Sequence, residues 1–81
     1  YTVSGFIRTD DASYQNGDVR CSIYFNDLEV VGQDMTTACI NAWEQFTLTF
    51  TASQTAEYTL VWKMYYENGA KSYWLDDLTI V

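Results

Sequence analysis

The chain contains no histidine, no proline and only four glycines among its 81 residues. Histidine is the commonest general base and a frequent zinc ligand, so its absence removes the usual catalytic triads and most zinc sites. The lack of proline, with so little glycine, excludes collagen-like and linker-like sequences. No apolar run approaches the roughly 18 residues of a membrane span. These absences argue against an enzyme and against a membrane-spanning protein.

Basic residues are also scarce, because four Lys and Arg stand against 11 Asp and Glu, for a net charge of −7. A field of this sign repels phosphate backbones, so a nucleic-acid partner is not expected. The same field is compatible with cations and with neutral partners such as sugars. Hydrophobic residues make up 48% of the chain and aromatic residues 17%, which excludes a disordered chain and predicts a single small domain over residues 1–81.

Alternation of apolar and polar residues recurs along the chain, whereas helical periodicity is weak throughout. The clearest case places Phe46, Leu48 and Phe50 on one face and threonines on the other. Turn signals separate the alternating segments, among them Asn26-Asp27 and a hairpin signal at Asn68-Gly69. The pattern predicts an all-β fold, an antiparallel β-sandwich of about six strands, with strands over 1–9, 19–25, 28–31, 44–51, 58–66 and 72–81 and a loop over 32–42.

The last strand carries Trp74, Leu78 and Ile80 on one parity and two adjacent carboxylates, Asp76 and Asp77, in its middle. Adjacent side chains of a strand point to opposite faces, so Asp76 shares the apolar parity and is expected to point inward. A buried carboxylate needs hydrogen bonds, a charged partner or a metal. The alternatives are a calcium ion or backbone N–H groups at a strand bulge. Catalysis by the pair is not expected, because the two groups diverge.

Cys21 and Cys39 form an even pair 18 positions apart. In a secreted domain they would form one disulfide, which stabilises by about 3 kcal/mol through loop closure. The alternative is two buried thiols in a cytosolic protein. The bridge is favoured, because small β domains commonly need such cross-links.

Aromatic residues are the main candidates for a binding surface, because sugar rings stack on aromatic faces while polar side chains bind their hydroxyls. The core aromatics are expected to be Phe46, Phe50 and Trp43. The candidate carbohydrate-binding residues, which lie outside the core parity or in the first loop, are Phe6, Arg8, Tyr14, Tyr24 and Tyr65, with Trp62 and Trp74 as alternatives if the parity is reversed.

Four stretches resemble the CenC-like carbohydrate-binding modules of the galactose-binding-like jelly-roll superfamily, the fungal extracellular versions above all. They are residues 1–8 (YTVSGFIR), 21–25 (CSIYF), 43–52 (WEQFTLTFTA) and 74–80 (WLDDLTI). The resemblance implies a jelly-roll sandwich, an extracellular location and non-catalytic binding of a glycan. It also implies a structural calcium, with Asp76 or Asp77 as one ligand.

Members of that family begin with a further segment before the strand that matches residues 1–8, and this segment often supplies a calcium ligand. The comparison therefore predicts a fragment, a cleaved piece, or a homo-oligomer or subunit completed by a strand-donating neighbour, since an open sheet edge favours pairing with another chain. The alternative function that follows is a structural or adhesive sandwich in a surface or extracellular fibre. An enzyme is not expected, because no nucleophile and base are brought together by the pattern.

Overall fold

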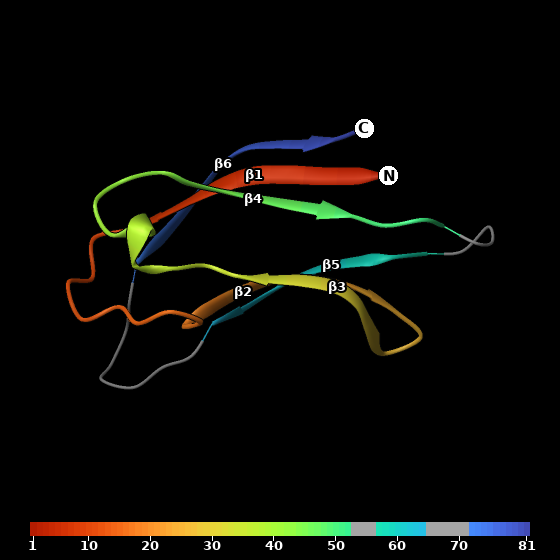
Figure 1. Ribbon diagram of the computed structural model, residues 1–81, viewed down its shortest axis with the longest axis horizontal. Helices are drawn as coiled ribbons and strands as arrows, with labels where there is room; N and C mark the ends of the chain where they lie inside the picture. The colour runs from red at the N-terminus through yellow and green to blue at the C-terminus, as the bar shows by residue number, and fades with distance from the viewer. Residues whose placement is uncertain (53–56, 65–71) are drawn as a thin grey trace.

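The computed structural model describes residues 1–52, 57–64 and 72–81, which form an antiparallel β-sandwich (Figure 1). This architecture confirms the all-β sandwich predicted from the alternation of apolar residues. No helix in this part of the chain is long and apolar enough to cross a membrane. The described elements are β1 (Thr2–Thr9), β2 (Val19–Phe25), β3 (Leu28–Asp34), a short 3-10 helix η1 (Thr37–Cys39), β4 (Glu44–Thr49), β5 (Thr59–Met64) and β6 (Tyr73–Ile80).

The strands form two sheets of three, in the orders β4-β1-β6 and β3-β2-β5. Strands β2 and β3 form a hairpin, whereas every other pair of consecutive described strands is divided between the sheets (Figure 1). The hairpin signal Asn68-Gly69 lies outside the described residues. The pairing it implied is nevertheless wrong, because β5 pairs with β2 and β6 pairs with β1.

The β2–β3 hairpin turns at Asn26 and Asp27, which have φ angles of 51° and 62°. Asn and Asp tolerate this left-handed backbone, and two such residues in succession match the twist of a hairpin. Strand β3 then continues to Asp34 rather than ending at residue 31 as predicted. It continues because Arg20 of β2 pairs in register with Asp34.

The core lies between the sheets and follows the predicted alternation. Central strand β1 contributes Val3 and Ile7, and the cleanest predicted strand, β4, contributes Phe46 and Leu48. A fully buried side chain of this kind contributes about 1.5–3 kcal/mol relative to an exposed one. The other buried members of the cluster are Tyr14, Val19, Cys21, Ile23, Met35 and Cys39.

Gly5, in the middle of β1, allows the closest packing in this core. It pairs with Phe46 of β4, and a Cβ atom at Gly5 would lie 2.9 Å from Cζ of the Phe46 ring. The same Cβ would lie 3.4 Å from the backbone oxygen of Asp76 in β6. The ring therefore rests on the bare backbone of the central strand, so a larger residue at Gly5 must displace it.

We expect Gly5→Ala to destabilise the sandwich by about 1–3 kcal/mol, because the added methyl overpacks the Phe46 ring. Urea unfolding followed by tryptophan fluorescence measures the change. A glycine in a strand interior ordinarily costs stability relative to alanine, so the sign is informative. Ser4→Ala, at the half-buried neighbouring position, is the matched control. A Gly5→Ala variant as stable as the parent would contradict this packing.

Candidate functional site

A shallow hollow of about 300 Å³ is lined by Phe6, Trp43, Asp76 and Asp77. Phe6 alternates with the buried Gly5 and therefore points away from the core. Asp76 pairs directly with Phe6 and so shares its outer face. Trp43 immediately precedes β4 and reaches the hollow from the other side of β1. The hollow thus lies on the outer face of the β4-β1-β6 sheet and draws residues from all three strands or their ends.

A β-bulge in β6 presents the two carboxylates at this hollow. Ser4 pairs with Thr79 and Phe6 pairs with Asp76, so two residues of β6 lie opposite Gly5 alone. Asp77, one of the two, has a φ of 51°. Its backbone N–H donates a hydrogen bond to Oδ1 of Asp76 over 2.8 Å. The adjacent acids therefore belong to a local backbone feature, and one satisfies an N–H group freed by the bulge.

The prediction that Asp76 points into the core is wrong, because both Asp76 and Asp77 are exposed. Trp74 shares the parity of Asp76, and it is 46% exposed. Trp74 and Asp76 do share one face of β6, as predicted, but that face is the outer one. The reason is the partner strand: Asp76 and Trp74 lie opposite Phe6 and Arg8, which point outward from β1.

Trp43 was expected in the core, yet it is 45% exposed. A signal for this was present in the sequence, since Trp43 has the same parity as Gln45, Thr47 and Thr49 on the outer face of β4. Burial of Phe46 is confirmed, and Phe50 is half-buried against the core cluster. Trp43 is thus the aromatic member of the hollow that the prediction missed.

Arg8 and Trp74 extend the outer face beyond the hollow. They pair with each other across β1 and β6, two residues along from the pair formed by Phe6 and Asp76. Arg8 is half-buried, and its Nε atom is buried without a hydrogen-bond partner among the described residues. Of the predicted sugar-binding residues, Phe6 and Arg8 therefore share one face, with Trp74, named as an alternative, beside them.

Tyr24 lies on the other sheet and does not approach the hollow. It is half-buried on β2, and the Lys63 ammonium lies 4.7 Å from the centre of its ring. That distance is within the range of a cation–π interaction. Tyr65 lies outside the described residues. Trp62, the second alternative, packs on the core and contacts Phe46 edge to face.

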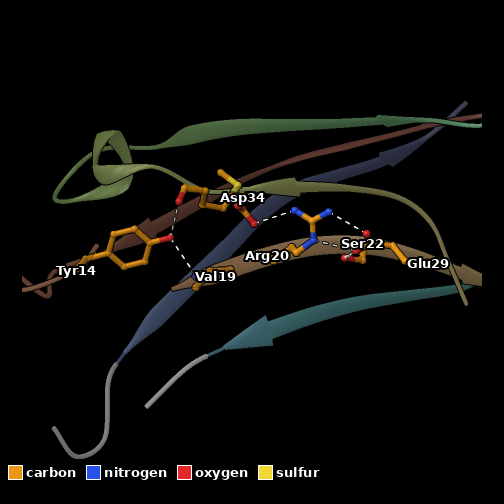
Figure 2. A network of polar contacts seen from close by, with 7 residues as sticks. Tyr14, Val19, Arg20, Ser22, Glu29 and Asp34 are labelled. Carbon is orange, nitrogen blue, oxygen red and sulfur yellow. Dashed lines mark hydrogen bonds and ion pairs between the residues drawn. The ribbon is translucent and has the colours of Figure 1, made fainter. Parts of the chain in front are cut away.

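Tyr14 is a structural residue rather than an exposed clamp for a sugar. Its side chain is 3% exposed. The hydroxyl donates to the Met35 carbonyl over 2.8 Å and accepts from the Val19 N–H over 3.1 Å (Figure 2). Burial raises the pKa of Tyr14 above its ordinary value. The first loop is thereby attached to the start of β2 and the end of β3.

The outer face of the β3-β2-β5 sheet carries charges that compensate one another (Figure 2). Arg20 forms ion pairs with Glu29 and Asp34, each over 2.8 Å. The buried Ser22 hydroxyl donates to Glu29 over 2.5 Å. Gly32 makes room for this network, since a Cβ there would lie 2.6 Å from Nη2 of Arg20. Hydrogen bonds from Arg20, and then from Ser22, lower the pKa of Glu29 from 4.5 to about 2.

This lowered pKa predicts an acid-sensitive contribution to stability. A carboxyl whose pKa is depressed by folding stabilises above its unfolded pKa and loses that contribution as the pH falls through the folded value. We expect the Glu29 contribution to be complete above pH 4.5 and lost toward pH 2. Urea unfolding between these limits, compared with Glu29→Gln, measures it. Parallel pH profiles for the two proteins would contradict the assignment, and Asp27→Asn in the adjacent turn is the control.

The predicted disulfide is absent, because Cys21 and Cys39 are both free and buried. Cys21 pairs across the sheet with Trp62, whereas Cys39 lies at the end of η1 against Tyr14. Each thiol thus packs against a different aromatic side chain. Burial raises the pKa of Cys21 to about 12 and also raises that of Cys39. The cysteines therefore act as small core residues and give no argument for an oxidising compartment.

Calcium at Asp76 and Asp77 would need further oxygen ligands. The ion takes six to eight oxygens as a rule. Across residues 1–52, 57–64 and 72–81, no three Asp, Glu, Cys or His side chains converge on a metal position. One oxygen of Asp76 already accepts the Asp77 N–H. The described donors therefore do not form a calcium shell, and the predicted calcium stays a prediction.

Fold and site together define a small antiparallel β-sandwich with an acidic, aromatic-lined hollow on one outer face. Comparison with protein-family models, with curated proteins and with solved structures finds no match to this chain. The resemblance to carbohydrate-binding modules therefore stays a prediction.

Proposed function

We propose that the chain is a non-catalytic, extracellular carbohydrate-binding module that holds a glycan on the outer face of the β4-β1-β6 sheet. The observation that carries this proposal is the gathering of exposed aromatic rings and charged groups on that face. Trp43 and Phe6 line the hollow with Asp76 and Asp77. Trp74 extends the aromatic surface along β6.

The chemistry of these groups suits sugars better than it suits a purely apolar ligand. The C–H faces of a sugar ring stack on aromatic rings, and carboxylate oxygens accept hydrogen bonds from hydroxyl groups. Arg8 adds donors on the same face, with a buried Nε that has no partner among the described residues. A shallow, extended face fits a chain of sugars rather than a small enclosed molecule.

Bond cleavage is not part of the proposal. Asp76 and Asp77 are adjacent in sequence, and one oxygen of Asp76 is engaged by the Asp77 N–H. Glycoside hydrolysis needs two carboxyl groups that flank the scissile bond from opposite sides. Adjacent residues of one bulge do not supply that geometry, so retention of the glycan is the activity we propose.

We expect Trp43→Ala and Trp74→Ala each to weaken glycan binding by about tenfold or more, as for the loss of an aromatic anchor at an interface. Both side chains are about half exposed, so their removal should leave the fold intact. Affinity electrophoresis across a panel of soluble polysaccharides measures retention. Tyr24→Ala, on the opposite sheet, is the matched control and should bind as the parent does.

Two results would count against this site, and a third would show a folding defect. Parent protein that migrates unretarded through every polysaccharide would contradict glycan binding. Loss of retention in Tyr24→Ala, with Trp43→Ala unaffected, would move binding to the other sheet. Equal loss in all three variants, with altered circular dichroism, would indicate unfolding instead of a binding defect.

A second candidate function is assembly through the edge strand β6, as in a structural or adhesive fibre. Leu75 pairs with the buried Ile7 and Ile80 with the buried Val3, so both share the core face of the sheet. Nevertheless Leu75 is 43% exposed and Ile80 65% exposed. In the described order β4-β1-β6, one side of β6 also has no neighbouring strand. An exposed edge with uncovered apolar side chains favours pairing with another chain.

If β6 drives assembly, sedimentation velocity should show larger species as the protein concentration rises. Replacing Leu75 and Ile80 together with serine should then return the protein to a monomer, because the uncovered apolar surface is removed. Val30→Ser, an exposed apolar position on β3, is the control. A parent protein that stays monomeric at all concentrations would contradict assembly of this chain with itself.

A further inference from the structure

We infer that the hollow selects a cationic glycan, namely an oligomer of amino sugars with protonated amines, over neutral and acidic sugars. This inference rests on the proposed glycan-binding function and specifies the ligand class of the same site. It is carried by the combination of two carboxylates, Asp76 and Asp77, with two aromatic rings, Phe6 and Trp43, around one hollow.

Within residues 1–52, 57–64 and 72–81, no ion pair compensates the negative charge at the hollow. Neither Asp76 nor Asp77 forms an ion pair with another described residue, whereas Glu29 and Asp34 on the opposite sheet are both paired with Arg20. The chain has 11 acidic and only four basic residues, and of the described cations Arg20 pairs on the opposite sheet while Lys63 lies over the Tyr24 ring. A ligand that brings its own cation supplies the missing partner.

The aromatic rings favour the same class of ligand. The face of a Trp or Phe ring attracts an ammonium group through its electron-rich centre. An amino sugar offers both a C–H face for stacking and an ammonium group for the carboxylates. A neutral sugar offers only the first, and an acidic sugar meets repulsion from Asp76, Asp77 and the net charge of −7.

Arg8 is the one basic side chain, among the described residues, that the register places on this face near the hollow. It lies two residues along β1 from Phe6, opposite Trp74, and does not line the hollow. Because Arg8 carries one positive charge and does not line the hollow, the two carboxylates leave the hollow negatively charged. Arg8 is therefore placed to meet hydroxyl groups of a neighbouring sugar, beyond the one that carries the ammonium.

The test is a titration of the folded protein, followed by tryptophan fluorescence, with three β-linked oligomers of equal length. These are glucosamine, N-acetylglucosamine and glucose oligomers, of which the first alone is cationic. We expect the glucosamine oligomer to bind several-fold more tightly than the other two. The difference should shrink as salt is added, because exposed charges are screened.

Asp76→Asn and Asp77→Asn isolate the carboxylates with little change in shape. Asparagine at position 76 retains an oxygen that accepts the Asp77 N–H, and asparagine at position 77 tolerates the positive φ. We expect each variant to bind the glucosamine oligomer roughly two- to fivefold more weakly. Binding of the glucose oligomer should not change. Asp27→Asn removes one charge in the β2–β3 turn, which belongs to the other sheet, and this variant should bind as the parent does.

Equal affinity of the parent for glucosamine and glucose oligomers would overturn the cationic selectivity and leave the proposed glycan binding standing. Failure to bind any oligomer or polysaccharide would overturn the proposed function, and this inference with it. An equal loss in Asp27→Asn and Asp76→Asn would also overturn the inference, since it would show attraction by net charge without a site.

Discussion

The contact between the Phe46 ring and the bare backbone of Gly5 is the constraint on which the site depends. Because β1 is the central strand of its sheet, the position of Gly5 affects both β4 and β6. Opposite this glycine, β6 carries the bulge that gives Asp77 its positive φ. Gly5 thus contacts the Phe46 ring of the core and also lies opposite the β6 bulge that presents the two carboxylates.

The two outer faces of the sandwich use their charges differently. On the β3-β2-β5 sheet, Arg20 and Ser22 donate hydrogen bonds to Glu29, and these bonds lower the pKa of that carboxyl and favour its charged form. On the β4-β1-β6 sheet, Asp76 and Asp77 have no ion-pair partner among the described residues and stand beside exposed aromatic rings. The charges of one outer face are thus paired within the chain, whereas those of the other face remain open to the ligand that we propose.

Alternation predicted most of the fold, because a strand with one buried face must repeat every two residues. Strand β2 (Val19–Phe25) has the predicted bounds, and Phe46 and Leu48 are buried as expected. Alternation could not say which strands pair, so the hairpin expected at Asn68-Gly69 was wrong. The disulfide prediction failed for the same reason, since a spacing of 18 positions does not say which aromatic side chain each thiol will contact.

The amino-acid sequence by itself determined that this is a small, acidic, all-β domain, and which side chains of each strand share a face. For β6, only the tertiary structure decided which face is inside. Trp74 and Asp76 were correctly grouped by parity, yet they lie outside because their partners Phe6 and Arg8 do. The physical reason is that alternation is a local property of the backbone, whereas burial depends on the strand and the sheet that lie opposite.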